Sequence, residues 1–187
     1  MKIKSLKFKS VNSTNDIALD LIKKNKFKPT LISAEQQIKG RGTMGKKWVS
    51  KKGNLYLTIY FEIDQKKINF KHYAVLNAYL LKYIIRKKYS DQVQIKWPND
   101  LLIKKKKICG ILQEVLKIGK KNFLIIGIGI NTNFNPITKQ FNSISLKDIK
   151  KKKINNKKLL ESIKKEYENL LRRLKTYSFQ ELKKIYK

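Results

Sequence analysis

A glycine-rich hexapeptide with one arginine is the first segment of this sequence that could do chemistry. Residues 40–45 read Gly-Arg-Gly-Thr-Met-Gly, which places three glycines around Arg41. Glycine lets backbone N–H groups approach an anion closely, and arginine adds a permanent positive charge. The segment lacks the Gly-Lys-Ser/Thr ending of a P-loop, and no helical pattern follows it as a dinucleotide-binding fold requires. It is therefore either a phosphate-binding loop or an ordinary surface loop.

A second candidate lies at residues 96–100, which read Lys-Trp-Pro-Asn-Asp. The proline ends a strand pattern, so Asn99 and Asp100 would project oxygen atoms at a bend, where they could hold Mg²⁺ together with nucleotide phosphates. The alternative is a plain Pro-Asn-Asp turn with capping side chains. Farther along, Lys107 precedes a strand pattern in which Gly110 would admit a ligand. In so lysine-rich a chain, Lys107 taken by itself is better interpreted as one more surface lysine.

A third candidate is the segment 127–131, Gly-Ile-Gly-Ile-Asn. Its two glycines would share one face of a strand and open space beside a sheet, with Asn131 at the strand end; the alternative is a close packing contact. We expect Cys109 to be a small buried thiol and His72 a helix-surface imidazole. The sequence contains no Cys/His cluster typical of zinc and no Gly-x-Ser-x-Gly nucleophile motif.

Strand and helix patterns flank each of these motifs and must position them. Alternating apolar residues predict strands, and apolar residues at helical spacing predict helices. Hairpins outnumber β-helix-β crossovers, so we expect one α+β domain over residues 1–187 with a mainly antiparallel sheet. The expected strands are 3–11, 30–34, 54–63, 93–97, 101–103, 108–116 and 123–130; the expected helices are 13–22, 69–88 and, with helical periodicity throughout, much of 145–187.

Composition limits the class of protein. The chain has 187 residues, 41% of them hydrophobic, and a formal net charge of +32 from 45 Lys and Arg against 13 Asp and Glu. That apolar content excludes a disordered tail, and no apolar run reaches the ~20 residues of a membrane span. The N-terminus has no secretory signal pattern, and a single cysteine favours a reducing cytoplasm. Because only four of the 45 basic residues are arginine, the charge indicates either a solvated lysine surface or a surface for an acidic partner.

In this order, the motifs resemble the catalytic domain of biotin–protein ligases, the enzymes that attach biotin to a lysine of carboxylase carrier domains. The resemblance is close over residues 10–135 and loose elsewhere. It implies an α+β fold similar to class II aminoacyl-tRNA synthetase-like domains, with a mainly antiparallel or mixed sheet and helices packed on one face. It rests on Ser13-Thr14-Asn15, Gln37, residues 40–45, Trp48, Asn54-Leu55-Tyr56, residues 96–100, Lys107, Gly110-Ile111-Leu112 and residues 127–131.

The resemblance also implies roles for individual residues. Arg41, Lys107 and Asp100 would be catalytic, and Asp100 and Asn131 would hold Mg²⁺. Biotin would contact Ser13, Thr14, Asn15, Gln37, Gly40, Arg41, Gly42, Lys107, Gly110 and Leu112. The nucleotide would contact Arg41, Thr43, Trp48, Asn99, Lys107 and Asn131. The implied activity is ATP-dependent formation of biotinyl-5′-AMP and transfer of biotin to a biotin carboxyl carrier protein domain of the acetyl-CoA carboxylase type, as by a biotin–[acetyl-CoA-carboxylase] ligase in the cytoplasm.

Two departures from the family pattern leave alternatives open. Thr43 stands where relatives commonly carry a second loop arginine, which makes a non-catalytic biotin binder one alternative. We also expect neither an N-terminal DNA-binding domain nor a C-terminal SH3-like barrel. Homodimers are common among relatives, but no interface is identified in the sequence. The remaining alternatives are a lipoate or octanoate ligase or transferase and a basic nucleic-acid-binding module; we expect no membrane partner and no specific nucleic acid.

Overall fold

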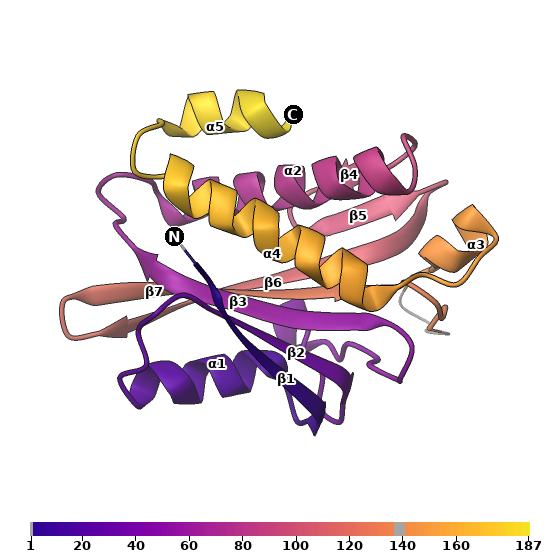
Figure 1. Cartoon of the computed structure of the whole chain (residues 1–187), viewed down its shortest axis with the longest axis horizontal. Coiled ribbons are helices and arrows are strands. Elements are labelled where there is room, and N and C mark those ends of the chain that lie inside the picture. Colours follow the sequence, from indigo (N-terminus) through magenta and orange to yellow (C-terminus); the bar gives the residue numbers. More distant parts are fainter. Residues whose placement is uncertain (1, 137–140) are drawn as a thin grey trace.

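The architecture is an α+β arrangement around a single central sheet (Figure 1). The computed structural model describes residues 2–136 and 141–187. In this part of the chain, none of the helices is long and apolar enough to cross a membrane. In chain order, the elements are β1 (Lys4–Val11), α1 (Thr14–Lys23), β2 (Thr30–Gln37), the 3₁₀ turn η1 (Thr43–Gly45), β3 (Leu55–Ile63), α2 (Phe70–Lys88), β4 (Gln94–Lys96), β5 (Asp100–Ile103), β6 (Lys106–Ile118), β7 (Lys121–Ile130), α3 (Leu146–Lys150), α4 (Asn156–Arg173) and α5 (Phe179–Tyr186).

The described strands form one seven-stranded sheet in the order β1-β2-β3-β7-β6-β5-β4. Strands β1 and β2 are parallel and are joined by α1, whereas every other neighbouring pair in this sheet is antiparallel. The expected α+β class with a mainly antiparallel sheet is therefore confirmed. The two residues Lys104 and Lys105 join β5 to β6, and both have positive φ, as a tight two-residue hairpin requires.

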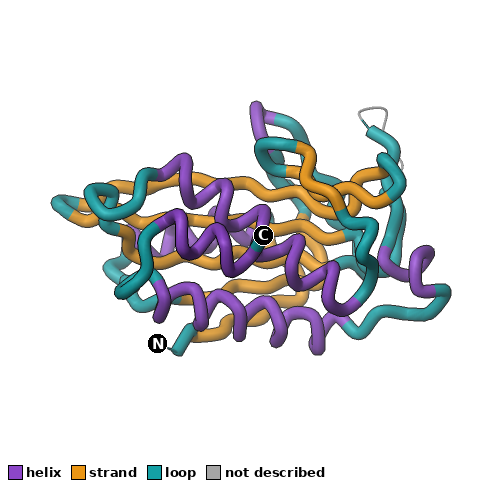
Figure 2. Tube along the Cα trace, turned by 90° about the horizontal axis from the view of Figure 1, so that it is seen from above, coloured by secondary structure: helices purple, strands orange, loops and turns teal. Residues whose placement is uncertain are grey.

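Helices cover both faces of the sheet, so the expectation of helices on one face needs correction. The larger core lies under α2, α4 and α5, while α1 packs on the opposite face around Ala18, Ile22 and Tyr60 (Figures 1 and 2). The reason is visible in β3 and β7, whose side chains are buried almost without interruption. A strand that alternates apolar and polar residues has one wet face, but a continuous apolar strand must be covered on both.

Two strand boundaries bear on the candidate residues. The expected strand 30–34 continues to Gln37, because Gln36 and Gln37 pair with Ser10 and Val11 of β1. Gln37 is thus held at the end of a strand rather than in a loop. Strand β7 ends at Ile130, which puts Asn131 directly beyond the central strand, as the sequence pattern predicts.

Candidate functional site

Most of the candidate residues meet in one cavity on the face of the sheet that also carries α1. Its space is about 450 Å³, part of it open to solvent. The contributing segments are the start of α1, the end of β2, the 40–48 loop, the middle of β3, the start of β5, the first half of β6 and the second half of β7. The lining consists of Ser13, Thr14, Asn15, Gln37, Arg41, Gly42, Thr43, Trp48, Leu57, Asn99, Asp100, Lys107, Gly110, Ile111, Leu112, Gly127, Ile128 and Gly129.

Three glycines form the floor of this cavity. Gly110 pairs with Gly129 across β6 and β7, and Gly127 follows on the same face. A Cβ atom at Gly127 would lie 2.4 Å from the Asn15 side chain, and one at Gly129 would lie 2.3 Å from Trp48 Nε1. Only glycine at these positions lets the α1 N-terminus and the indole of Trp48 lie directly on the sheet.

The wall beside α1 is a network of neutral polar groups. Ser13 caps the helix by accepting a hydrogen bond from the Asn15 N–H at 3.2 Å. The backbone N–H and hydroxyl of Thr14 both donate to Gln37 Oε1, at 2.8 and 3.0 Å. Gln37 Nε2 then donates to Ser50 Oγ at 2.8 Å. Amides and hydroxyls fixed in this way can both donate to and accept from an uncharged polar ligand.

Arg41 lies at the α1 side of the cavity between two carboxylates. Its two terminal nitrogens donate to both oxygens of Glu114, at 2.9 and 3.0 Å, and Nη2 also lies 2.9 Å from Asp16 Oδ1. The pKa of Arg41 is raised: burial opposes the charged form, but the contacts with Glu114 and then Asp16 outweigh it. Neither acidic residue was identified from the sequence, although carboxylates are scarce enough in this chain to have been a signal.

A second ion pair joins Lys107 and Asp100. Lys107 Nζ lies 2.6 Å from Asp100 Oδ1, and the two side chains are only 14% and 19% exposed. The same ammonium lies 5.1 Å from the centre of the Trp48 ring, within the range of a cation–π interaction. Lys107 is therefore not an ordinary surface lysine. A plain turn with capping side chains would not account for the ion pair of Asp100 with Lys107.

Two buried donors of the cavity have no hydrogen-bond partner among the described residues: Arg41 Nε and Trp48 Nε1. Buried polar atoms without partners are rare in folded proteins and call for an explanation, such as a ligand. Since both atoms are donors, they fit a ligand that offers acceptors, such as a carboxylate or a phosphate. Asn99 lies nearby with its Nδ2 donating to the Ile111 carbonyl at 3.1 Å.

Two of the expected site residues lie outside the cavity lining. Gly40 is packed at the base of the loop, where a Cβ atom would lie 2.3 Å from the Trp48 carbonyl oxygen. Asn131 is 1% exposed, and its Nδ2 donates to the Lys107 carbonyl at 3.1 Å. Its Oδ1 accepts from Asn54 Nδ2 at 3.5 Å. The side chain of Asn131 therefore supports the backbone of Lys107 from behind the cavity.

Two residues outside the cavity fit their expected positions. Cys109 is buried and free, and burial raises the pKa of its thiol, with Asp100 adding to the effect and Lys107 opposing it. His72 lies on the surface of α2, where its ring stacks on Phe179 with the centroids 4.0 Å apart. Over residues 2–136 and 141–187, no group of three or more His, Cys, Asp or Glu side chains is placed to hold a metal ion.

Comparisons of the sequence and of the structure with known proteins both find similarity to biotin protein ligases. A family model described as "Biotin/lipoate A/B protein ligase family" matches residues 7–131. The chain is 37% identical over 123 residues to the bifunctional ligase/repressor BirA of Escherichia coli K12, which is 65% of this chain and 38% of that relative. The chain thus spans well under half the length of that curated relative.

Solved structures superpose over nearly the whole chain. The biotin protein ligase of Aquifex aeolicus in complex with biotin and ATP matches with a TM-score of 0.79 and 30% identity, covering 95% of this chain and 74% of that one. The Leishmania major biotin protein ligase in complex with biotinyl-5-AMP matches with a TM-score of 0.80 at 23% identity, covering 98% and 79%. At that identity the second match supports the fold alone.

Proposed function

Because the chain belongs to the biotin/lipoate A/B protein ligase family, we propose that it activates biotin with ATP and transfers the biotin to a lysine of a carrier domain, as a biotin–[acetyl-CoA-carboxylase] ligase. The observation that carries this proposal is a single cavity with a neutral polar wall at α1 and with Arg41 and Lys107 in the same lining. Biotin combines an uncharged cyclic urea with an acid at the end of an alkyl chain. The Aquifex aeolicus relative, with bound biotin and ATP, supports the same substrates.

The polar wall suits the urea end of biotin. A urea offers one acceptor oxygen and two N–H donors, and it carries no charge. Ser13, Thr14, Asn15 and Gln37 present hydroxyl, amide and backbone groups of both kinds. The floor of Gly110 and Gly127, with Leu112 beside them, would accommodate the apolar ring and chain. We therefore propose that these residues contact biotin.

The acid end of biotin would then lie among the cationic groups. In the proposed first step, a carboxylate oxygen of biotin forms a bond to the α-phosphorus of ATP, and the bond to the β-phosphate oxygen breaks, releasing pyrophosphate. Two anions approach each other, so Arg41 and Lys107 would stabilise the charge that develops, and Trp48 Nε1 would supply a neutral donor. In the second step, a lysine amine of the acceptor attacks the carbonyl carbon, AMP leaves, and the amine releases one proton.

The residues of the cavity fit a magnesium ion delivered with the nucleotide. Magnesium keeps several waters and is usually held through one or two carboxylates together with substrate phosphates. Asp100 offers one such carboxylate beside Lys107, and it is the residue we propose to hold the ion. Bound there, magnesium would supply charge neutralisation at the phosphates. The amide of Asn131 is engaged by Lys107 and Asn54, so we assign it support of Lys107 rather than metal binding.

The test is exchange of labelled pyrophosphate into ATP, with biotin, lipoate and octanoate supplied side by side. We expect exchange with biotin alone, because the dithiolane of lipoate and the methyl end of octanoate would leave the polar wall unpaired. Exchange with lipoate or octanoate in place of biotin would assign the chain to the other branch of the family. Tight biotin binding without exchange would make it a non-catalytic binder. Streptavidin detection of a modified carrier domain would establish the transfer step.

A further inference from the structure

Thr58 on β3 is fully buried and lies just behind the cavity lining, of which it is not a part. Its hydroxyl oxygen lies 2.8 Å from the hydroxyl oxygen of Thr14 and 2.6 Å from Asn15 Oδ1, both in the first turn of α1. The Thr14 hydroxyl oxygen in turn lies 3.0 Å from Gln37 Oε1. These four oxygen atoms form a row, which we call the oxygen row, in the order Asn15, Thr58, Thr14 and Gln37.

The amide groups at the two ends of the oxygen row both turn an acceptor toward the threonines. Asn15 Nδ2 donates to Glu114 Oε2 at 2.6 Å, so the amide oxygen of Asn15 faces Thr58. Gln37 Oε1 accepts from the backbone N–H of Thr14 at 2.8 Å. Turning over the Asn15 amide would set two acceptors against each other, and turning over the Gln37 amide would set two donors against each other. The orientation of both amides is therefore fixed by their other contacts.

The oxygen row has three contacts but only two hydroxyl protons. An amide oxygen accepts and cannot donate, and each threonine hydroxyl carries a single proton. One of the three contacts therefore has no hydrogen between its oxygens, whichever way the hydroxyls turn. The contact between Thr58 and Asn15 is the shortest, at 2.6 Å, and two oxygens so close need a proton between them. With the Thr58 proton there, the single proton of Thr14 can serve Gln37 or Thr58, but not both.

This count of protons decides what the wall can offer to a ligand. Thr14 and Gln37 both line the cavity. If the Thr14 proton turned toward a ligand, two contacts of the oxygen row would lack a hydrogen instead of one, which is costly for buried groups. Toward a ligand, the side-chain oxygens of Thr14 and Gln37 therefore act as acceptors. Ser13 differs, because in the described part of the chain its oxygen only accepts, from the Asn15 N–H, so its own proton can be donated.

We propose that Thr58 is a positioning residue that selects a ligand with an N–H donor at this wall, because it keeps the Thr14 hydroxyl in the accepting role. The inference deepens the proposed function and rests on it for the identity of the ligand. A cyclic urea supplies an N–H to Thr14 and Gln37, and its carbonyl oxygen can accept from Ser13. The dithiolane ring of lipoate has no such donor. Thr58 acts through Thr14 and does not itself contact the ligand.

The test uses desthiobiotin and two analogues of it, in each of which a ring oxygen replaces one N–H of the cyclic urea. We expect the wild-type protein to bind desthiobiotin about 100-fold more tightly than the weaker of the two analogues, because that ring oxygen would face two acceptors. In Thr58→Val the Thr14 proton can turn to the ring oxygen at lower cost, and we expect the ratio to fall to about tenfold. Calorimetric titration gives the dissociation constants.

Thr58→Ser keeps the hydroxyl, and we expect it to keep the wild-type ratio. Thr30→Val is the matched control, because Thr30 is buried on the same face of the neighbouring strand β2 and its hydroxyl donates to the Lys28 carbonyl at 2.8 Å; we expect an unchanged ratio. If Thr58→Val weakens binding of desthiobiotin and both analogues by the same factor, Thr58 has a purely structural role and the proposal is wrong. Should Thr58→Val not fold, Thr58→Ala removes the same hydroxyl with a smaller side chain.

Neutron diffraction from crystals of the deuterated wild-type protein gives a test that does not depend on the ligand. We expect the Thr58 deuterium to lie toward Asn15 and the Thr14 deuterium to lie toward Gln37 or Thr58. A Thr14 deuterium directed into the cavity would overturn the proposal. If the wild-type protein binds neither biotin nor desthiobiotin, the proposed function fails, while the deuterium positions still decide whether Thr58 keeps Thr14 in the accepting role.

Discussion

Among the many lysines of this chain, Lys107 is distinguished by its surroundings and not by its type. It is 14% exposed, paired with Asp100 and close to the Trp48 ring, whereas its neighbour Lys106 is exposed. A sequence shows the type of a residue but not its burial, so spacing alone left Lys107 undecided between surface and site. The resemblance carried by the ordered set of motifs assigned Lys107 to the site, and the structure places it in one cavity with Gly110 and Gly129.

We expect Lys107→Ala to lower biotin-dependent pyrophosphate exchange about 100-fold, because one fixed cation near the developing charge is lost. Lys106→Ala is the matched control, since it removes an exposed lysine from the adjacent position of the same strand. The exchange rate, measured with circular dichroism as a check on folding, tests the prediction. Equal activity in the two variants would contradict the role assigned to Lys107.

Asn131 permits a test that separates support from metal binding. Asn131→Asp keeps an oxygen that could bind magnesium but loses the Nδ2 donor to the Lys107 carbonyl. We expect exchange to fall about tenfold, the value of one hydrogen bond to a buried carbonyl, while the half-saturating magnesium concentration stays the same. The measurement is exchange as a function of magnesium concentration at a temperature where the variant is folded. A lower half-saturating concentration would restore Asn131 as a metal ligand.

At the scale of elements, the first turn of α1 has two functions, which can be separated. Ser13 caps α1 by accepting from the Asn15 N–H and also lines the cavity. Ser178 caps α5 by accepting from the Glu181 N–H within a capping box, and it does not line the cavity. We expect Ser13→Ala and Ser178→Ala each to lower the free energy of unfolding by about 1 kcal/mol. Only Ser13→Ala should also weaken biotin binding. Urea denaturation and calorimetric titration of biotin test the pair, and an equal loss of biotin affinity in both variants would assign Ser13 to stability alone.

Most of the elements could be predicted from periodicity, and the failures have a common cause. The strands ending at Val11, Ile63 and Ile130 and the helix beginning after Asn69 follow the expected boundaries. The extension of β2 to Gln37 depends on pairing with β1, a long-range contact that no local pattern contains. The same holds for the pairing of Glu114 with Arg41, which joins residues 73 positions apart. The coverage of both faces of the sheet was predictable in principle, because β3 and β7 are continuous apolar runs.

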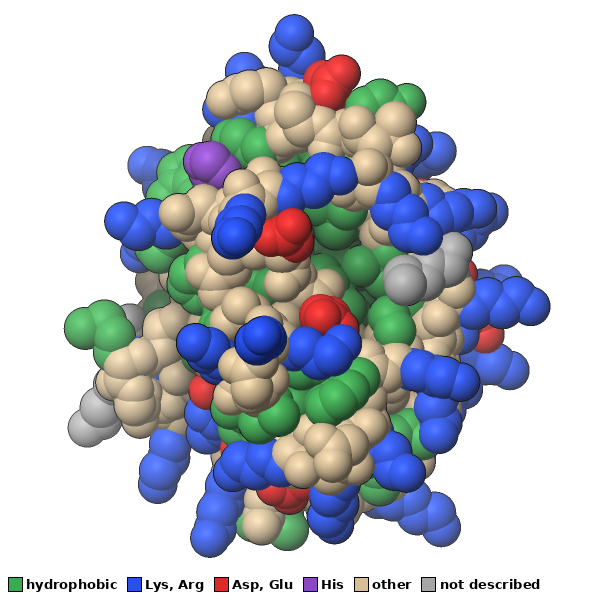
Figure 3. All heavy atoms as spheres, turned by 90° about the vertical axis from the view of Figure 1, so that its left-hand side faces the viewer, with side chains coloured by type: hydrophobic (Ala, Val, Ile, Leu, Met, Phe, Trp, Pro, Cys, Tyr) green, Lys and Arg blue, Asp and Glu red, His purple; other side chains and the backbone are tan. Residues whose placement is uncertain are grey.

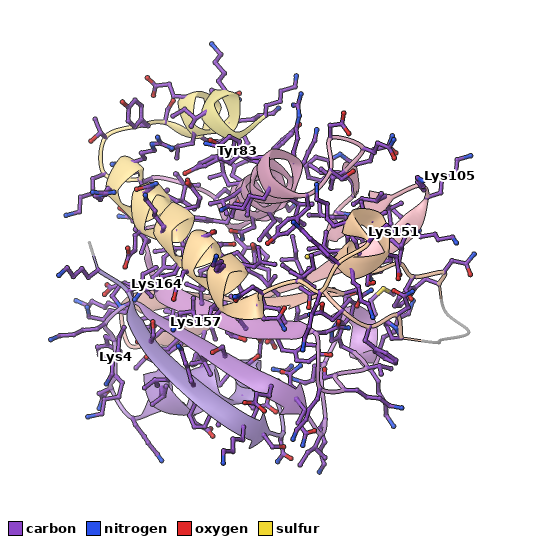
Figure 4. All side chains as sticks on the ribbon, turned by 45° about the vertical axis from the view of Figure 1, so that its right-hand side comes forward. Lys4, Tyr83, Lys105, Lys151, Lys157 and Lys164 are labelled. Carbon is purple, nitrogen blue, oxygen red and sulfur yellow. The ribbon has the colours of Figure 1, made fainter. Side chains whose placement is uncertain are left out.

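At the scale of the molecule, net charge predicts the surface but not the cavity. Exposed lysines such as Lys4, Lys105 and Lys157 come from separate parts of the chain, a strand, a turn and a helix (Figure 4). Basic side chains are spread over the face shown in Figure 3, with few acidic ones between them. Three of the 13 acidic residues nevertheless form ion pairs with Arg41 and Lys107, the two cationic residues of the cavity lining. The two cations and their three carboxylate partners together have a negative net charge, whereas the net charge of the whole chain is positive. This grouping depends on the fold and could not be predicted from the sequence.

The buried tyrosines predict sensitivity to high pH. Burial, with a smaller effect of Asp64, raises the pKa of Tyr73 from about 10 to about 12. Between these values the unfolded chain has lost the phenol proton and the folded chain has kept it, so stability is complete below pH 10 and falls as pH rises toward 12. We expect Tyr73→Phe to reduce the loss of unfolding free energy between pH 10 and 11 by about 1 kcal/mol. Urea denaturation at both pH values tests this, and identical losses in the two proteins would contradict it.

The lysine surface predicts how the protein meets its proposed acceptor. A charge of +32 creates a field that speeds the approach of an acidic partner, and salt screens this field over about 10 Å at 0.1 M. We expect the rate of biotin transfer to an acidic carrier domain, under conditions limited by encounter, to fall about tenfold between low salt and 0.3 M salt. A carrier domain with its surface carboxylates changed to amides is the control, because its slower rate should depend little on salt. If the unmodified carrier domain also reacts at a rate that is flat with salt, the lysines serve solvation alone, and recognition of the acceptor must come from short-range contacts around the cavity.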